Sequence, residues 1–259
     1  MPETILVVPC FNEAHRLAVE QFEGFIKLHP DLHFLLVNDG STDDTLEMLR
    51  GLESRDPTHF SVLDQQPNQG KAEAVRQGML AAFEKGPAYA GFWDADFAAP
   101  LEAAPTFVEL LKSRPDLEMV FGSRVKLLGR SVERSVLRHY LGRIFATAAS
   151  VTLRLPVYDT QCGAKLFRAS PENAALFQAP FVTRWIFDVE LIARLIQARR
   201  DTELPQAADV IYEFPLHVWH DVEGSKVKAS DFPKAFFEIL KIHRRYLGRR
   251  ARRQRTRQP

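Results

Sequence analysis

Residues 4–39, "TILVVPCFNEAHRLAVEQFEGFIKLHPDLHFLLVND", decide the fold class of this chain of 259 residues. Two short runs of mostly aliphatic residues, 4–9 and 33–39, are typical of buried β-strands. Between them, residues 13–28 carry apolar side chains at three- and four-residue spacing, which predicts an amphipathic helix. The stretch therefore predicts one strand–helix–strand unit.

The same alternation continues through the first half of the chain. Residues 60–64 and 89–96 have the composition of strands, whereas residues 43–52 and 71–85 have the spacing of helices. Repeated β-α-β units predict an α/β domain with a mostly parallel central sheet and helices on both faces. In such sheets, ligands bind at the carboxyl ends of the strands.

Composition narrows the class of protein. The 46% hydrophobic and 26% charged residues are those of an ordinary globular protein. Cys10 and Cys162 are too few for a disulfide framework, and no secretory signal pattern follows Met1, so we expect a reducing, cytoplasmic location. The longest uncharged, mostly apolar run, 144–153, is half of the ~20 residues that a spanning helix needs, so we expect no membrane crossing.

Charge is distributed unevenly along the chain. The net charge is +1, but residues 241–259 hold nine of the 34 Lys and Arg side chains and none of the 33 acidic ones. This basic tail is typical of a segment that binds nucleic acid or an anionic membrane, and equally of a solvated terminus.

Three polar motifs follow predicted strands: "PCFNE" (9–13), "NDGSTDDT" (38–45) and "DAD" (94–96). Their residues can be explained as turns and helix caps, with Asn12 and Ser41 or Thr42 at cap positions. Asp39 is the exception, because an acid at the end of a strand can accept hydrogen bonds from a nucleobase or ribose. The convergence of the motifs on one edge of the sheet predicts a binding site there.

A fourth segment, "NQGKAEAVRQG" (68–78), places Gly70 and Lys71 at the start of a helix, an arrangement that suits an anion. It lacks the spacing of a P-loop, and no GxGxxG follows the first strand, so neither phosphate-binding fingerprint is present.

Asp94 and Asp96 stand one residue apart at the end of an apolar run. In a strand, such residues share a face and can point at one site. Carboxylate oxygens favour Mg²⁺ or Mn²⁺, which fill their other positions with phosphate oxygens and water, as the departure of a diphosphate requires. The alternative is a pair of unrelated surface acids.

In their order and spacing, these motifs resemble the family 2 glycosyltransferases. "GSR" (122–124), "DTQCGAKLF" (159–167), "RWIFDVELI" (184–192) and "HVWHDVEGSKV" (217–227) resemble more specifically the dolichyl-phosphate β-glucosyltransferase branch. The resemblance implies a GT-A fold in a single domain, residues 1–240. Its nucleotide-sugar-binding, Rossmann-like half is 1–97 and its acceptor half is 98–240, followed by the basic tail 241–259.

The resemblance also implies site residues. The candidates for contact with the nucleotide sugar are Pro9, Phe11, Asn12, Glu13, Asp39, Lys71, Asp94, Ala95 and Asp96. Asp94 and Asp96 are also the candidate metal ligands, although relatives often carry a polar residue where this chain has Ala98.

On the acceptor side, the resemblance implies that Arg124 and Arg138 bind phosphate, with Arg134 as the alternative to Arg138 and Lys226 as a further cation. Asp159 is either a general base or a turn residue that orders the "QCG" loop, and we favour the turn.

Two predicted helices leave alternatives open. Residues 135–155 carry an apolar stripe beside several cations, which suits either a membrane interface or the core. Residues 184–200 form an amphipathic pattern in which we expect Asp188 near the site and Glu190 on a solvated face.

The predicted function is an inverting, metal-dependent transfer of a hexose to a polyprenyl or dolichyl phosphate, with UDP-glucose favoured over GDP-mannose as donor. A lipid phosphate is already an anion, so it needs no general base. We expect peripheral binding to an anionic, cytoplasmic membrane face and no nucleic acid partner. The alternatives are transfer to a soluble saccharide or protein hydroxyl, and a nucleotide-sugar-binding module without catalysis.

Overall fold

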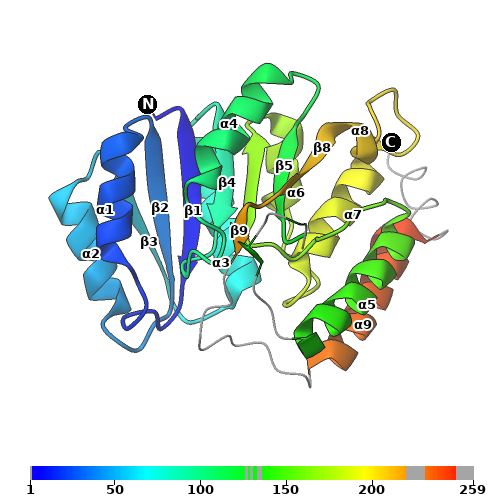
Figure 1. The fold of residues 1–259 in the computed structure, drawn as a ribbon, viewed down its shortest axis with the longest axis horizontal. Helices are drawn as coiled ribbons and strands as arrows, with labels where there is room; N and C mark the ends of the chain where they lie inside the picture. The colour runs from blue at the N-terminus through cyan, green and yellow to red at the C-terminus, as the bar shows by residue number, and fades with distance from the viewer. Residues whose placement is uncertain (1, 126–127, 129–130, 133–135, 220–230, 249–259) are drawn as a thin grey trace.

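The computed structural model describes residues 2–125, 128, 131–132, 136–219 and 231–248. A seven-stranded sheet runs through the domain in the order β3-β2-β1-β4-β7-β5-β8, and only β7 is antiparallel to its neighbours. Figure 1 shows this sheet with helices packed around it. Its strands are β1 (Thr4–Cys10), β2 (Leu32–Asp39), β3 (Phe60–Gln65), β4 (Tyr89–Trp93), β5 (Met119–Ser123), β7 (Ala164–Arg168) and β8 (Ile211–Pro215). A second sheet pairs β6 (Ser131–Val132) with β9 (Val218–Trp219).

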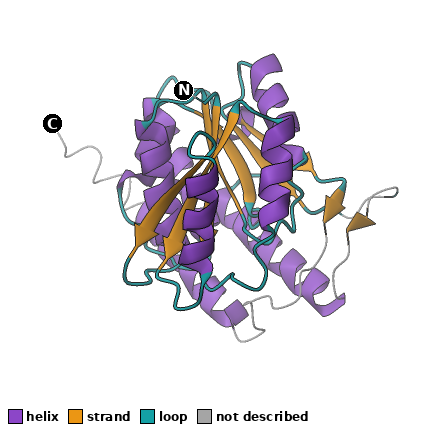
Figure 2. Cartoon of the chain, turned by 90° about the vertical axis from the view of Figure 1, so that its left-hand side faces the viewer, coloured by secondary structure: helices purple, strands orange, loops and turns teal. Residues whose placement is uncertain are grey.

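Helices cover both faces of the sheet (Figure 2), as the sequence predicts. One face carries α1 (Val19–Leu28), α2 (Thr45–Arg55) and α4 (Ala103–Ser113). The other carries α3 (Lys71–Glu84), α5 (Val136–Leu153), α6 (Pro171–Gln178), α7 (Phe187–Arg199) and α9 (Asp231–Ile242). The short α8 (Ala207–Val210) precedes β8, and the π-helix η1 (His243–Leu247) continues α9.

Alternation along the strands divides the core into two layers. Ile5 and Val7 of β1 pack under α3, whereas Leu6 and Val8 pack under α1 and α4. Every residue of β2 is buried. A strand covered on both faces needs no polar alternation, which explains why the strands appear in the sequence as continuous apolar runs.

The strand order reverses next to β1, since β2 and β3 lie on one side of it and β4 on the other. The loops that follow β1 and β4 therefore leave the sheet in different directions. In open α/β sheets the ligand-binding crevice lies at this reversal of strand order, at the carboxyl edge, so we expect the crevice of this protein there. All the strand-end motifs lie at this edge.

Two predicted boundaries are wrong. The helix expected over 13–28 begins at Val19, because residues 13–17 form turns whose amides bond within the loop and to the next motif. The strand expected over 89–96 ends at Trp93, so Asp94 and Asp96 do not share a strand face. They lie instead in the turn after β4.

Candidate active site

The first two motifs bind each other through side chains. The amide of Asn12 donates to Ser41 Oγ at 3.1 Å, and the amide of Thr42 donates to Asn12 Oδ1 at 2.8 Å. The amide of Glu13 donates to Thr45 Oγ1 at 2.8 Å. Asn12 and Ser41 therefore join two loops and do not cap helices, and the two motifs form one wall of the crevice.

Asp39 lies beneath this wall, 2% exposed. Its Oδ1 accepts from Gln65 Nε2 (3.1 Å) and the Gln69 amide (2.8 Å), and its Oδ2 accepts from Asn68 Nδ2 (2.9 Å) and the Gly70 amide (2.9 Å). Burial raises the pKa of Asp39, and the two amides oppose that rise. The four donors match the acceptor capacity of a carboxylate, so Asp39 holds residues 65–70 in place; its contact with a nucleotide stays a prediction.

Glycine allows this loop to come close to the second motif. Gly40 has a φ of +66°, and a Cβ at this position would lie 2.4 Å from the Asn68 amide nitrogen. A larger residue would push residues 66–70 away from Asp39.

The carboxylate pair lies in the turn after β4, next to the start of α3. Asp94 Oδ1 is 2.5 Å from Lys71 Nζ, and the Asp94 amide donates to Gly163 O at 2.9 Å. Asp96 Oδ1 accepts from the Ala98 amide at 3.1 Å. Burial, followed by the charge of Asp94, raises the pKa of Asp96. The two carboxylates therefore repel each other in a partly buried place where a cation stabilises both.

A buried ion pair lies behind the carboxylates. Lys165 is 0% exposed, with its Nζ 2.6 Å from Asp188 Oδ1 and 2.5 Å from Cys162 O. Burial would lower the pKa of Lys71, but the charges of Asp94 and Asp188 outweigh it and raise that pKa. Lys165, Asp188, Lys71 and Asp94 thus alternate in sign from the core to the crevice. Sequence reasoning missed Lys165; its only signal was a lysine within the apolar strand "AKLFR".

Arg124 and Asp159 form a two-pronged ion pair. Arg124 Nε lies 2.6 Å from Asp159 Oδ2, and Nη2 lies 2.7 Å from Oδ1. The amides of Arg124 and Gln161 also donate to this carboxylate, both at 3.0 Å. A general base needs a carboxylate oxygen that can accept a proton, and here both oxygens already accept hydrogen bonds. The contacts therefore match the interpretation of Asp159 as a residue that orders the loop.

The remaining predicted residues are placed as follows. Pro9 in β1, Phe11 after it and the buried Ala95 lie at the carboxyl edge of the sheet. Arg138 lies on α5, where only its backbone is described, and Arg134 and Lys226 lie outside the described residues.

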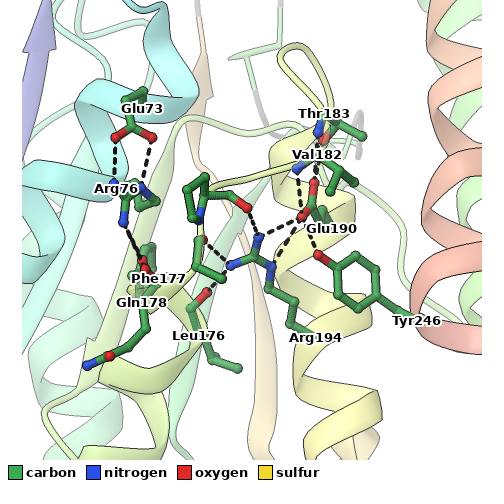
Figure 3. Close-up of polar contacts among 12 residues, drawn as sticks. Glu73, Arg76, Leu176, Phe177, Gln178, Val182, Thr183, Glu190, Arg194 and Tyr246 are labelled. Atoms are coloured by element: carbon green, nitrogen blue, oxygen red, sulfur yellow. Dashed lines mark hydrogen bonds and ion pairs between the residues drawn. The ribbon is translucent and has the colours of Figure 1, made fainter. Parts of the chain in front are cut away.

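The prediction of a solvated Glu190 is wrong, since its side chain is 0% exposed. Glu190 Oε1 is 2.7 Å from both Arg194 Nη2 and the donating hydroxyl of Tyr246 (Figure 3). The amides of Val182 and Thr183 also donate to Glu190, both at 3.0 Å. Arg194, four residues later on α7, was the signal in the sequence for a buried pair.

Two features of the described residues bear on the predicted cofactor and membrane contact. No three or more His, Cys, Asp or Glu side chains cluster there in a way that could hold a metal ion, so Asp94 and Asp96 are a two-residue set. Within the same ranges, no helix has both the length and the apolar character that crossing a membrane requires.

Sequence comparison places the chain among known enzymes. The profile described as "Glycosyl transferase family 2" matches residues 5–174. A dolichyl-phosphate beta-glucosyltransferase of Trichomonas vaginalis is 30% identical, with 92% of this chain and 70% of the relative covered. The dolichyl-phosphate beta-glucosyltransferase of Saccharomyces cerevisiae is 29% identical, with 93% and 74% covered.

Solved structures share the fold at lower identity. Glucosyl-3-phosphoglycerate synthase from Mycobacterium tuberculosis, in complex with Mn²⁺, UDP and glucosyl-3-phosphoglycerate, superimposes with a TM-score of 0.64 at 16% identity, covering 93% of this chain and 78% of that one. The mannosyltransferase PcManGT from Pyrobaculum calidifontis, in complex with GDP-mannose and Mn²⁺, superimposes with a TM-score of 0.59 at 15% identity. The superposition covers 93% of this chain and 63% of that one. The predicted GT-A fold is confirmed, and the chain belongs to glycosyltransferase family 2, whose members are nucleotide-sugar-dependent transferases.

Proposed function

We propose that this enzyme transfers glucose from UDP-glucose to a dolichyl or polyprenyl phosphate with inversion at the anomeric carbon. The observation that carries the proposal is the placement of Asp94, Asp96 and Lys71 at the crevice where the strand order reverses. The similarity to dolichyl-phosphate beta-glucosyltransferases over more than nine-tenths of the chain supports the choice of sugar and acceptor. In this proposal, residues 1–97 bind the donor and residues 98–240 the acceptor.

The residues of the crevice fit a divalent cation. Asp94 Oδ1 is buried and lies 2.5 Å from the Lys71 ammonium group, and the pKa of Asp96 is raised by burial and by the charge of Asp94. Asp94 and Asp96 would hold Mg²⁺ or Mn²⁺, with phosphate oxygens and water in place of the polar residue that Ala98 replaces. Such an ion neutralises charge on a departing diphosphate.

The protein's own groups then position the reactants. Lys71, the first residue of α3, places a positive charge at the helix end that attracts anions. The phosphate of the acceptor attacks the anomeric carbon of the sugar without the help of a general base. This agrees with the hydrogen bonds that occupy Asp159, the candidate base. Catalysis then rests on alignment of the phosphate with the sugar and on charge neutralisation.

Gly163 is expected to be essential for the carboxylate pair. A Cβ at residue 163 would lie 2.0 Å from Asp94 Oδ2, so Gly163→Ala must move that carboxylate. We expect at least a ~100-fold loss of transfer rate, the scale of a 1 Å misplacement, in a steady-state assay with Mn²⁺. Gly24→Ala on α1 is the matched control, because nothing lies within 4 Å of its added Cβ. A Gly163→Ala enzyme with the wild-type rate would contradict this placement of Asp94.

We also propose that α5 and α9, which pack side by side, face an anionic membrane together with the basic tail 241–259. A shallow groove along α5 is lined by Arg143, Ile144, Thr147, Ala148 and Val151. Ile144 is 57% exposed, Val151 72% and, on α9, Phe237 68%. In this groove the cation Arg143 lies beside the apolar Ile144 and Val151, and apolar and cationic groups together are the two signals that peripheral binding needs.

Ile144→Asp combined with Val151→Asp is expected to weaken binding to phosphatidylserine vesicles at least ~10-fold, because each apolar side chain contributes about 1.5–3 kcal/mol when buried. Flotation of vesicles measures the effect, and Leu28→Asp on α1, at a 77% exposed position, is the control. Unchanged flotation of the double variant would rule out this surface.

The proposed function is tested with purified enzyme, Mn²⁺, dolichyl phosphate and a panel of labelled sugar nucleotides that includes UDP-glucose and GDP-mannose. We expect an organic-extractable, glucose-labelled product that EDTA abolishes. Labelling of a soluble saccharide or protein, without lipid product, would favour the alternative acceptor. Binding of sugar nucleotide without any transfer would favour a module that has lost catalysis.

A further inference from the structure

The segment between α6 and α7 approaches the donor side of the crevice and is held from two directions. Its first part is fixed by the buried Glu190, which accepts from the amides of Val182 and Thr183, both at 3.0 Å (Figure 3). Thr183 Oγ1 adds a third hydrogen bond at 2.9 Å. This part of the segment is therefore anchored to α7.

The second part is held by Glu238 of α9. The carboxylate of Glu238 accepts from the amides of Arg184, Trp185 and Ile186 at 3.3, 3.3 and 3.4 Å. Two carboxylates thus bind five consecutive amides, residues 182–186. Because five consecutive amides are hydrogen-bonded, the backbone of this segment holds its exposed side chains in a fixed direction. One of these side chains is the cation Arg184.

Arg184 lies against the start of α3. Its Nη2 is 3.4 Å from Gln69 O, and a Cβ at Gly70 would lie 3.7 Å from the same nitrogen. The next residue, Lys71, contacts the Asp94 carboxylate at 2.5 Å. Arg184 therefore lies at the rim of the crevice, on the side of the carboxylate pair.

Arg184 differs from the other cations near the crevice in what its side chain contacts. Within the part of the chain that the structure describes, no carboxylate lies within ion-pair distance of Arg184, whereas Lys71, Arg124 and Lys165 each contact one. The Arg184 guanidinium contacts Gln69 O of the loop that Asp39 holds, and its charge opposes the rise that burial causes in the pKa of Asp39. A guanidinium that forms no ion pair with a described residue, at the edge of the crevice that also holds Lys71, suits an anionic ligand.

We propose that Arg184 is an additional donor-binding residue, whose guanidinium binds the diphosphate of the nucleotide sugar, and that Glu238 is its positioning residue. The proposal rests on the proposed function. The planar fork of arginine suits phosphate oxygens, and the N-terminus of α3 beside it attracts the same charge. The acceptor phosphate shares this chemistry, and Arg184 itself belongs to residues 98–240. Its guanidinium nevertheless contacts Gln69, in the loop that Asp39 fixes, so it reaches into the proposed donor half.

Calorimetric titration with UDP and Mn²⁺ tests the contact. Arg184→Ala is expected to weaken UDP binding about 10- to 100-fold, the loss of one charged hydrogen-bonding group. The affinity of Arg184→Lys for UDP is expected to lie between those of the wild type and Arg184→Ala. The control is Arg114→Ala, an exposed arginine paired with Asp116. Wild-type affinity for UDP in Arg184→Ala would overturn the proposal, and so would a raised KM for dolichyl phosphate with unchanged UDP affinity. A wild-type enzyme that binds neither UDP nor GDP would instead overturn the proposed function itself.

The positioning role of Glu238 has its own signature. Glu238→Ala is expected to raise the KM for the sugar nucleotide several-fold with kcat retained, and Glu238→Gln, which keeps an acceptor oxygen, is expected to restore most of the loss. Circular dichroism of both variants checks that the fold is intact. Equal donor KM in Glu238→Ala and the wild type would contradict the role of Glu238.

Discussion

Asp96→Asn is expected to reduce sugar transfer about 100- to 1000-fold, the cost of removing one preorganised charge-stabilising group from an active site. Asparagine keeps the size of the side chain and an oxygen for the Ala98 amide, so the turn after β4 is preserved. The negative charge that would hold Mg²⁺ or Mn²⁺ beside the diphosphate is lost. Initial rates at saturating donor and varied Mn²⁺ measure both the fall in kcat and the weaker dependence on metal.

The control for this variant is Asp116→Asn. It is an equally conservative substitution that removes one negative charge from an exposed ion pair with Arg114. It is expected to keep the wild-type rate. An Asp96→Asn enzyme with wild-type turnover and metal dependence would remove Asp96 from the metal site. Asp94→Asn is less informative, because Asp94 also pairs with Lys71.

Glu190→Ala is expected to have the largest effect on stability, about 3–5 kcal/mol, which is the cost of breaking a buried ion pair from one side. Arg194 would keep its bonds to the carbonyls of Leu176, Ala179 and Pro180 (2.8, 2.7 and 2.7 Å) but would lose its counter-charge. The Tyr246 hydroxyl would also lose its acceptor. Urea unfolding followed by circular dichroism gives the change in the free energy of unfolding.

Two further variants show whether a loss of stability in Glu190→Ala comes from the buried ion pair. Glu84→Ala, at an exposed position near the end of α3, is expected to change stability by less than about 0.5 kcal/mol. Glu190→Leu combined with Arg194→Met removes both charges and is expected to recover much of the loss, since apolar replacement of a buried pair is often tolerated. A Glu190→Ala protein within 1 kcal/mol of the wild type would show that the network contributes little.

Much of the fold could be predicted from local pattern. The runs 4–9, 33–39 and 60–64 fall within β1, β2 and β3, because strands buried on both faces appear as continuous apolar runs. The helix over 71–85 is confirmed within one residue of α3. The grouping of the motifs at one edge also followed from the sequence, since parallel strands place their carboxyl ends together.

What failed depended on contacts between distant residues. Helical periodicity assigned Glu190 to a solvated face. Arg194, four residues later, was a local signal against that assignment, but the partner Tyr246 lies 56 residues away in η1. Lys165 was overlooked for the same reason, because its counter-charge Asp188 belongs to α7. The four donors to the Asp39 carboxylate all come from residues 65–70, and their approach depends on how the loop after β3 folds back. Spacing within one segment carries no information on these distant partners.

The central claim, transfer of glucose to a lipid phosphate, is tested most directly by the structure of the product. Enzyme supplied with UDP-glucose, Mn²⁺ and dolichyl phosphate is predicted to yield a glucosyl phosphodiester of dolichol in the β-configuration, identified by mass spectrometry and by the anomeric proton signal in NMR. A product in which glucose is joined to a hydroxyl group, with dolichyl phosphate recovered unchanged, would contradict it.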